Sequence, residues 1–413
     1  MQWNRMNVSR AESRSRFLLL EGIHEAAVEE LAASGHKDVE RLPHSLSGAD
    51  LKEAIRDVHF IGIRSRTQLD GETLRMAERL DAVGCFCIGT NQVDLEEARR
   101  LGIPVFNAPF SNTRSVAELA LADVILLMRG IPEKSARAHR GEWAKSTANA
   151  FEVRGKRLGI IGYGRIGTQL GILAEGLGMQ VLYYDIENKL PLGNATPVTS
   201  LKDLLQRAEV VSLHVPETDQ TRNMLNAETL AAMRPGSLLI NAARGTVVDV
   251  AALEQALDSG HIAGAAIDVF PVEPQSSKET FESPLRRFDN VILTPHIGGA
   301  TEEAQNNIAR EVVRKLIKYS HNGSTLSAVN FPQVSMPDHH DKTRILHVHR
   351  NEPGVMQQIN NVFSTHRVNI AAQYLQTHQD VGYVVMDIEL DDLGSLLDEL
   401  RAVEGTIRVR VLH

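Results

Sequence analysis

Short apolar runs alternate with helical patterns along the first 110 residues of the chain. Between the apolar runs, as in residues 23–33 and 71–80, apolar side chains recur at helical spacing. Buried strands separated by helices are typical of a parallel sheet, so we predict a first α/β domain here. Its expected strands are residues 17–20, 60–63, 85–88 and 105–106.

A second alternating series begins near residue 156 and predicts a complete doubly wound sheet. Before it, Ser115 and Glu118 form an S-V-A-E capping box, which predicts the start of a helix that runs to about Gly130. Apolar spacing predicts another helix, of roughly 18 residues, after Glu302. The six expected strands are residues 156–161, 181–184, 210–213, 237–240, 264–269 and 291–294.

The pattern changes again after residue 330. Residues 331–342 contain two prolines and little periodicity, which favours a linker. The remaining segments predict a β-α-β-β-α-β order, the arrangement of a ferredoxin-like sandwich. These segments are residues 344–349, 354–366, 370–376, 382–390, 393–403 and 406–412.

The composition of the 413 residues is that of a globular protein, with 43% apolar and 23% charged residues. Lys and Arg number 44 and Asp and Glu 52, so the net charge of −8 argues against a general nucleic-acid binder. The two cysteines, Cys85 and Cys87, lie in an apolar run and predict neither a metal site nor a disulfide framework, which suits the cytoplasm. Residues 1–16 carry arginines but no apolar core, so we expect no secretory signal, and no segment predicts a membrane span.

The first chemical motif is G-Y-G-R-I-G at residues 162–167, between a predicted strand and a predicted helix. Gly162, Gly164 and Gly167 allow a tight turn and let backbone N–H groups approach a pyrophosphate at the helix N-terminus. Asp185 ends the next strand, 18 residues after Gly167. A carboxylate there accepts hydrogen bonds from a ribose and repels a 2′-phosphate, so the motif predicts NAD as the cofactor and disfavours NADP.

Three further motifs follow predicted strands: N-A-A-R-G from residue 241, D-V-F-P-V-E-P from residue 268 and T-P-H-I-G-G from residue 294. Open α/β sheets bind ligands at the carboxyl ends of their strands, so these segments are expected to share one site. Together they offer what hydride transfer needs. His296 can remove a hydroxyl proton, Glu273 can orient that histidine, and Arg244 can bind a substrate carboxylate.

With these motifs the chain resembles the D-isomer-specific 2-hydroxyacid dehydrogenases. Further stretches extend the resemblance over nearly the whole length, to the short bacterial members that act on D-3-phosphoglycerate. These stretches are I-R-S-R-T, C-F-C-I-G-T-N-Q-V-D and F-N-A-P-F-S-N-T-R-S-V-A-E. The resemblance implies NAD-dependent oxidation of that substrate at the start of L-serine synthesis, with L-serine as a feedback inhibitor. It also implies a homo-oligomer, expected to be a tetramer, and a possible side activity on 2-oxoglutarate.

The resemblance also implies roles for individual residues. Arg244, Glu273 and His296 would be catalytic. Trp143 and Lys145 would approach the active site of a neighbouring subunit. The implied cofactor contacts are Gly162, Gly164, Arg165, Ile166, Gly167, Asp185, Ala242, Ala243, Arg244, Asp268, His296, Ile297, Gly298 and Gly299, and the implied substrate contacts are Arg64, Ser65, Arg66, Asn112 and Lys145.

The C-terminal unit resembles an ACT regulatory domain. The family's serine site would fall on His349, Asn351 and Asn369, since amide side chains offer both donors and acceptors to an amino acid. Two departures from the family bear on regulation. Glu352 stands in place of a basic residue, and His339-His340-Asp341 replaces a glycine pair in the linker.

The domain order implied by the resemblance places the NAD domain inside the substrate domain. We expect an extension at 1–16, a substrate domain at 17–111 and 298–330, a Rossmann domain at 112–297, a linker at 331–342 and an ACT domain at 343–413. Two alternatives stay open: an enzyme for an unphosphorylated acid such as glycerate or lactate, and an NAD-sensing transcriptional corepressor with the same fold. The pair Arg64 and Arg66 argues against the former, and the ACT-like unit argues against the latter.

Overall fold

The computed structural model describes residues 15–274, 279–338, 342–390 and 393–412. Nearly all of the expected N-terminal extension, and the His339-His340-Asp341 motif, therefore lie outside the described residues. Packing divides the chain into two units, residues 1–111 with 305–413 and residues 112–304. Each unit is described by itself.

Unit 1 (1–111 with 305–413) contains a five-stranded parallel sheet of flavodoxin-like order, β2-β1-β3-β4-β5. Phe17 and Leu19 pack with α11 on one face, and Leu18 packs with Leu51 of α2 and Leu74 of α3 on the other. Both faces are thus buried, as the continuous apolar runs predict. The strands are β1 (Phe17–Leu19), β2 (Val39–Arg41), β3 (Phe60–Ile63), β4 (Ala82–Cys85) and β5 (Val105–Asn107), and the helices are α1 (Ala26–Ala33), α2 (Gly48–Ala54), α3 (Gly71–Met76), α4 (Leu95–Arg100) and α11 (Glu302–Asn322).

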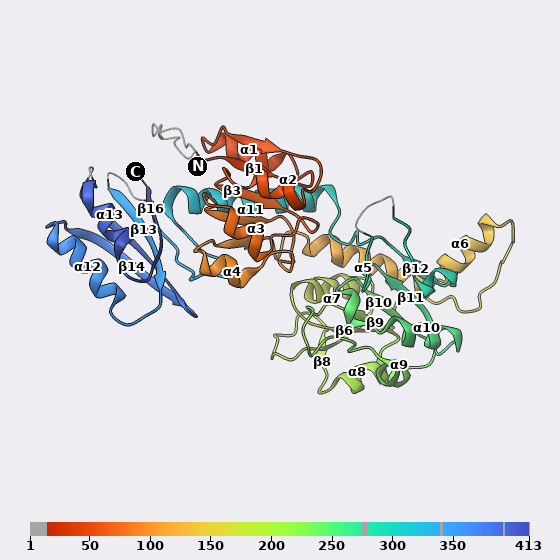
Figure 1. Cartoon of the computed structure of the whole chain (residues 1–413). Helices are drawn as coiled ribbons and strands as arrows, with labels where there is room; N and C mark the ends of the chain where they lie inside the picture. Colours follow the sequence, from red (N-terminus) through yellow and green to blue (C-terminus); the bar gives the residue numbers. More distant parts are fainter. Residues whose placement is uncertain (1–14, 275–278, 339–341, 391–392, 413) are drawn as a thin grey trace, which may run out of the picture. The chain divides into compact units, whose positions relative to one another are not determined.

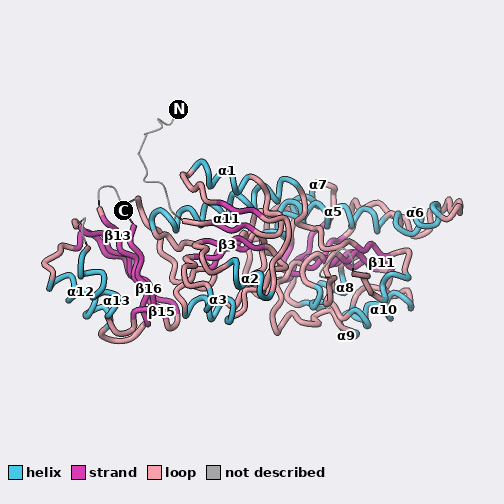
Figure 2. The backbone as a smooth tube through the Cα atoms, turned by 45° about the horizontal axis from the view of Figure 1, so that its top comes forward, coloured by secondary structure: helices cyan, strands magenta, loops and turns pink. Residues whose placement is uncertain are grey.

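The C-terminal part of unit 1 is an antiparallel sheet of order β14-β15-β13-β16, covered on one face by two helices (Figures 1 and 2). This β-α-β-β-α-β arrangement confirms the predicted ferredoxin-like fold. Ile345 and Met386 pack against the helices, while Leu346 and Tyr383 belong to the same core as Tyr319 of α11. The elements are β13 (Thr343–Arg350), α12 (Val355–Thr365), β14 (Ile370–His378), β15 (Val381–Ile388), α13 (Gly394–Ala402) and β16 (Thr406–Leu412).

The segment expected to be a linker is packed rather than extended into solvent over its described residues. Phe331, Val334 and Met336 are buried in the core that also holds α11. Close by, the guanidinium of Arg344 donates to both carboxylate oxygens of Asp387, at 2.6 and 2.8 Å, and to the carbonyl oxygens of Asn322 and Pro337. Such a fully bonded buried pair fixes β13 against the end of α11.

Unit 2 (112–304) is a seven-stranded parallel sheet of order β12-β11-β10-β9-β6-β7-β8. The six predicted strands are present, and Thr196–Pro197 adds a short edge strand, β8, that its length and proline conceal in the sequence. The other strands are β6 (Arg157–Ile161), β7 (Gln180–Tyr184), β9 (Val210–Leu213), β10 (Ser237–Asn241), β11 (Ile262–Ile267) and β12 (Val291–Leu293).

The strand order of unit 2 reverses at β6, which lies between β7 and β9. A crevice at such a switch point is where open α/β sheets bind ligands. The helices are α5 (Thr113–Met128), α6 (Ile131–His139), α7 (Arg165–Gly176), α8 (Leu201–Arg207), α9 (Ala227–Ala232) and α10 (Val250–Asp258), with short 3₁₀ turns at Gly245–Val247 and Pro284–Arg287.

The predicted capping box at Ser115 is wrong. Helix α5 begins at Thr113, with Asn112 as its N-cap residue, so Ser115 already lies inside the first turn. The Ser115 hydroxyl is 2.8 Å from the Thr301 hydroxyl, and Glu118 accepts a hydrogen bond from Arg114. These partners satisfy the two side chains in place of the helix backbone.

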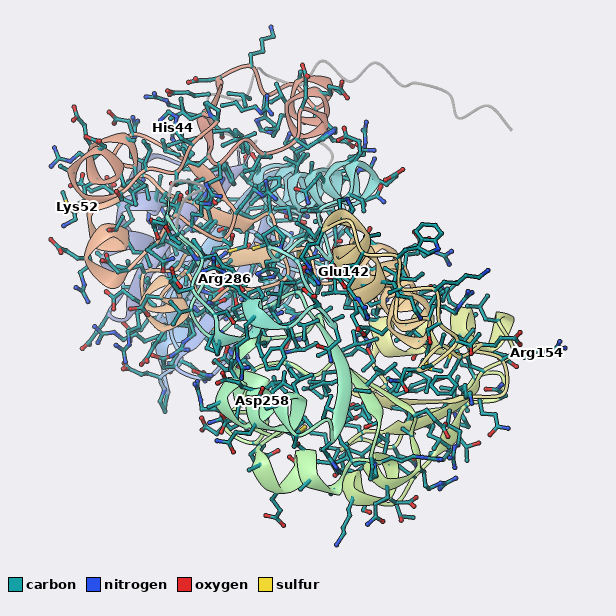
Figure 3. All side chains as sticks on the ribbon, turned by 90° about the vertical axis from the view of Figure 1, so that its right-hand side faces the viewer. His44, Lys52, Glu142, Arg154, Asp258 and Arg286 are labelled. Atoms are coloured by element: carbon teal, nitrogen blue, oxygen red, sulfur yellow. The ribbon has the colours of Figure 1, made fainter. Side chains whose placement is uncertain are left out.

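Charged side chains are spread over the exposed surface, among them Arg154, Asp258 and Arg286 (Figure 3). Among the described residues, no helix combines the length and the apolar character needed to cross a membrane.

Candidate functional site

The glycine loop of unit 2 connects β6 to α7, and each of its three glycines meets a different requirement. Gly162 has a left-handed φ of 92°, and a Cβ there would lie 2.7 Å from the carbonyl oxygen of His214. A Cβ on Gly167 would lie 2.3 Å from the carbonyl oxygen of Gly162. Around Gly164, in contrast, a Cβ would meet no protein atom within 4 Å. The open side of the loop therefore leaves space for a ligand beside the N-terminus of α7, where an anion is favoured.

Asp185 follows β7 and is fixed beside this loop. Its carboxylate accepts hydrogen bonds from the backbone N–H groups of Tyr163, at 2.8 Å, and Glu187, at 2.9 Å. Arg165 and Ile166 are the first two residues of α7, the helix that begins directly after Gly164. A glycine cradle, a helix N-terminus and a carboxylate at the next strand end form a site that fits the pyrophosphate and adenosine ribose of NAD.

The loop after β12 carries His296 and is held by the buried carboxylate of Asp268. One carboxylate oxygen accepts from the Thr294 hydroxyl (2.6 Å) and from the Ile297 N–H (2.8 Å), and the other accepts from the Gly298 N–H (2.8 Å). The His296 N–H donates to the carbonyl oxygen of Asp268 at 2.9 Å. These four bonds stabilise the unusual backbone of His296, whose φ is 55°.

His296 and Glu273 form the expected pair, with 2.9 Å between Nδ1 and the nearer carboxylate oxygen. The hydrogen bond to Glu273 raises the pKa of His296 despite the opposing effect of burial. Burial alone would raise the pKa of Glu273, but the His296 hydrogen bond and charge lower it overall. With Nδ1 donating to Glu273, Nε2 is left to accept a proton from a substrate hydroxyl.

Arg244 lies at the end of β10, one strand away from the loop of Asp268. Buried Asn241 shapes this turn, since its amide donates to the Arg244 carbonyl oxygen (3.0 Å) and its amide oxygen accepts from the Ala243 N–H (3.1 Å). The Arg244 guanidinium donates to the Ala243 carbonyl oxygen at 2.7 Å, which occupies one of its donors. The others are available to a carboxylate.

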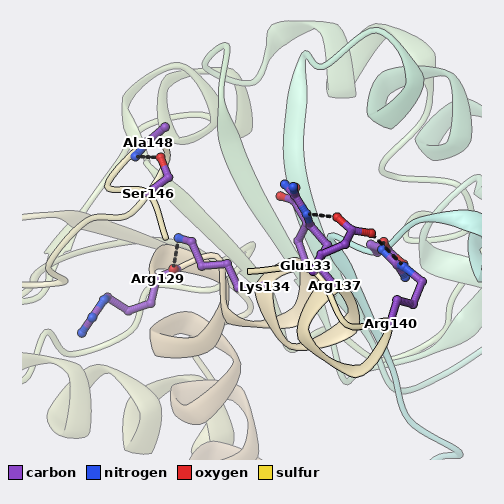
Figure 4. Close-up of polar contacts among 9 residues, drawn as sticks. Arg129, Glu133, Lys134, Arg137, Arg140, Ser146 and Ala148 are labelled. Atoms are coloured by element: carbon purple, nitrogen blue, oxygen red, sulfur yellow. Dashed lines mark hydrogen bonds and ion pairs between the residues drawn. The ribbon is translucent and has the colours of Figure 1, made fainter. Parts of the chain in front are cut away.

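Two expected substrate residues, Asn112 and Lys145, also belong to unit 2. The Asn112 side chain packs against Gly299, where a Cβ would lie 2.4 Å from the amide nitrogen, so Asn112 lies beside the His296 loop. Lys145 and Trp143 are exposed on the segment that follows α6, and Trp143 retains 89% of its accessible surface. Residues 129–148, called the arm below, comprise α6 and the segment after it, and they make polar contacts among themselves, such as Lys134 Nζ to the Arg129 carbonyl oxygen at 3.1 Å (Figure 4).

Arg64, Ser65 and Arg66 belong to unit 1, in the loop after β3. The carboxylate of Glu21 accepts hydrogen bonds from the N–H groups of Arg64, Arg66 and Thr67, at 3.1, 3.0 and 2.9 Å. Within the described ranges, neither the Arg64 nor the Arg66 guanidinium has an ion-pair partner. The loop is thus rigid at its backbone while its two cations remain available for an anionic ligand.

The three expected serine-site residues lie in the ACT-like part of unit 1. His349 of β13 is buried, and burial lowers its pKa. On the neighbouring strand β15, the paired residue Gly382 leaves room for this ring, since a Cβ there would lie 2.3 Å from His349 Nε2. The Asn351 amide donates to the Gln379 carbonyl oxygen at 3.1 Å, and Asn369 is exposed.

Sequence reasoning missed two residues that shape these loops. Glu21 has no motif that marks it, and its partners lie 43 to 46 positions away in the chain. Thr294 belongs to the T-P-H-I-G-G motif, whose pattern assigns it no role, and its hydroxyl is one of the three donors on the Asp268 carboxylate. A hydroxyl residue two positions before a histidine is a weak signal in the sequence, and only the fold shows that its hydroxyl binds Asp268.

Comparison with family models assigns residues 121–298 to "D-isomer specific 2-hydroxyacid dehydrogenase, NAD binding domain" and residues 345–408 to "AHAS small subunit-like ACT domain". The chain is 59% identical over 406 residues to the D-3-phosphoglycerate dehydrogenase of Haemophilus influenzae, covering 98% of this chain and 99% of the relative. It is 60% identical over 408 residues to the enzyme of that name from Escherichia coli K12, again covering 98% and 99%.

Among solved structures, the chain is similar to the D-lactate dehydrogenase of Aquifex aeolicus complexed with NAD and lactic acid. The TM-score is 0.66 at 28% identity, covering 74% of this chain and 95% of that one. It is also similar to D-2-hydroxyisocaproate dehydrogenase, with a TM-score of 0.69 at 25% identity, covering 76% and 99%. These likenesses confirm the predicted fold class and NAD as the cofactor.

The glycine loop yields a paired prediction. Gly167→Ala forces a Cβ against the Gly162 carbonyl, so we expect it to lower the unfolding temperature by about 4 °C or more and to weaken NADH binding. Gly164→Ala meets no protein atom, so we expect the unfolding temperature to stay within about 1 °C. Its methyl group would occupy the open space where the pyrophosphate is expected, and it should weaken NADH binding at least about tenfold. Thermal melts and NADH fluorescence titrations measure both, and full NADH affinity in Gly164→Ala would contradict this site assignment.

Proposed function

The chain belongs to the D-isomer-specific 2-hydroxyacid dehydrogenases, which makes it an NAD-dependent oxidoreductase, and we propose that it oxidises D-3-phosphoglycerate to 3-phosphooxypyruvate. The observation that carries this proposal is the pair His296 and Glu273 at 2.9 Å, on a loop fixed by Asp268. Relatives named for this substrate match the chain over almost its full length, which supports the choice of substrate.

The residues of unit 2 divide the chemistry among them. Bound NAD⁺ supplies the acceptor for the hydride from substrate C2. His296 Nε2 accepts the proton of the C2 hydroxyl, and the Glu273 carboxylate stabilises the imidazolium that forms. Arg244 binds the substrate carboxylate and so orients the C2–H bond. Release of a net proton favours oxidation as the pH rises. In the opposite direction the same pair can protonate a keto oxygen, and we include 2-oxoglutarate as a possible second substrate.

The phosphate of the substrate is the proposed ligand of Arg64 and Arg66. The support is that Glu21 fixes the backbone of their loop while no described acidic side chain pairs with either guanidinium. Unphosphorylated acids such as glycerate or lactate would leave both cations without a partner, which disfavours them as substrates.

L-serine is the proposed regulator and a homo-oligomer, expected to be a tetramer, the proposed assembly. The match of residues 345–408 to an ACT domain model supports an amino-acid ligand. Trp143, exposed to 89%, supports an interface on the arm that also carries Lys145, since a large indole is costly to leave in water. Cys85 and Cys87 are not joined in a disulfide, which fits the expected cytoplasmic location.

The acid–base role of His296 is tested by turnover and its pH dependence. His296→Ala should lower kcat by about 10³-fold while NADH affinity stays nearly unchanged. Oxidation needs neutral His296, whose pKa is raised by Glu273, so activity of the native protein should fall on acidification through a midpoint above about 6.5. Glu273→Gln removes that effect and should move the midpoint to lower pH. An unchanged midpoint in Glu273→Gln would show that another group controls the profile.

The phosphate role of Arg66 is tested by its effect on substrate affinity. Arg66→Gln should raise the KM for D-3-phosphoglycerate at least about tenfold, because a charge-assisted phosphate contact is lost. Arg79→Gln, which removes an exposed arginine of the same unit, serves as the matched control. Equal KM values in Arg66→Gln and the native protein would show that Arg66 does not bind the phosphate and is an ordinary solvated side chain.

The serine site is tested by inhibition. Asn369→Ala should raise the L-serine concentration for half-inhibition by about tenfold or more without changing uninhibited turnover. Glu352→Gln should lower that concentration, because it removes a negative charge next to Asn351 of the proposed site, and that charge would repel the ligand's carboxylate. Identical inhibition of the native protein, Asn369→Ala and Glu352→Gln would place the serine site elsewhere.

A further inference from the structure

The loop that follows β7 carries three charged residues, Asp185, Glu187 and Lys189. The Tyr183 hydroxyl donates to the Lys189 carbonyl oxygen at 2.8 Å, and the Glu187 N–H donates to the Asp185 carboxylate at 2.9 Å. These bonds fold the loop back on the end of the strand. The loop therefore has a defined shape at the place where the adenosine ribose of the cofactor is expected.

Lys189 is the basic side chain of this loop, and its charge is already engaged. Its ammonium forms an ion pair with the Glu187 carboxylate. The hydrogen bond that the ammonium donates to Glu187 is the main cause that raises the pKa of Lys189, and the charges of Glu187 and Asp185 add to it. One carboxylate thus contacts the ammonium and a second acts on it through its charge, and the three side chains together carry a net negative charge.

Cofactor choice depends on the charges near this strand end. A carboxylate that binds the ribose hydroxyls repels a 2′-phosphate, whereas a nearby cation accommodates it. Lys189 lies four positions after Asp185 and interacts with its charge. Without Glu187, Lys189 would be the cation that a 2′-phosphate needs.

We propose that Glu187 is a specificity-determining residue, which excludes NADP by holding Lys189 in an ion pair and so withholding the cation that a 2′-phosphate would require. This role adds to the repulsion by Asp185. It rests on the NAD site of unit 2 and not on the identity of the substrate.

The two carboxylates differ in how firmly they are held. The Tyr163 and Glu187 N–H groups fix the Asp185 carboxylate. The carboxylate therefore cannot move away from a 2′-phosphate without breaking these hydrogen bonds to the backbone. The Glu187 side chain retains 70% of its accessible surface, so it can be replaced without disturbing the core. On either side, Ile186 and Leu190 are 80% and 79% exposed, which suits a loop that an adenine ring covers.

The test is the equilibrium binding of NADH and NADPH, followed by nicotinamide fluorescence at low ionic strength in the full-length protein. Glu187→Gln should lower the Kd for NADPH about tenfold and change the Kd for NADH by less than about twofold, because one carboxylate is neutralised and Lys189 is released. The double variant Glu187→Gln/Lys189→Gln should lose that gain. Glu228→Gln, the same change of charge on an exposed residue of α9, should have no effect.

Two results would overturn the proposal: an unchanged Kd for NADPH in Glu187→Gln, or a gain that persists in the double variant, since Glu187 would then act by repulsion alone. Failure of the native protein to bind NADH would overturn the cofactor site and this inference together. NADH binding with the expected shift, but no oxidation of D-3-phosphoglycerate, would support this inference and contradict the proposed function alone.

Discussion

The carboxylate of Asp268 holds the loop of His296 in unit 2. Asp268 follows β11, and its carboxylate accepts hydrogen bonds from one hydroxyl and two backbone N–H groups. The backbone carbonyl oxygen of Asp268 accepts a further hydrogen bond from the N–H of His296. A loop bound at four points within five residues can hold its histidine at a positive φ that a free loop would avoid. The position of the imidazole is thus set by backbone hydrogen bonds, and Glu273 sets only its protonation and orientation.

The other loops of the candidate site are likewise held by a polar side chain that binds the backbone. Asn241 shapes the turn of Arg244, Asp185 accepts from the N–H of Tyr163, and Glu21 holds the loop of Arg64 and Arg66. In each case a buried or half-buried polar side chain binds backbone N–H or C=O groups that the end of a strand leaves unpaired. The loops are thus held mainly by side chains other than those of His296, Arg64 and Arg66, which suits the proposed binding of an anionic substrate and a dinucleotide.

The sequence predicted most of the elements because buried parallel strands are continuous apolar runs, and the glycine motif and Asp185 have fixed spacing. It missed what depends on tertiary contacts. Ser115 and Glu118 satisfy a capping pattern, yet Thr301 and Arg114 are nearer partners in the folded chain. Phe331 precedes Pro332, and Val334 and Met336 lie between Pro332 and Pro337 without periodicity, so only the core formed with α11 shows why these residues are apolar. Glu21 acts on residues more than forty positions away, beyond any local pattern.

The most direct measurement is the fate of the hydrogen on C2 of the substrate. Purified protein is incubated with NAD⁺ and D-3-phosphoglycerate that carries deuterium at C2, and the reduced cofactor is analysed by mass spectrometry. Direct hydride transfer at the site of His296 and Arg244 predicts NADH with one deuterium and an equal amount of 3-phosphooxypyruvate. Reduced cofactor without deuterium, or no reduced cofactor, would contradict the account.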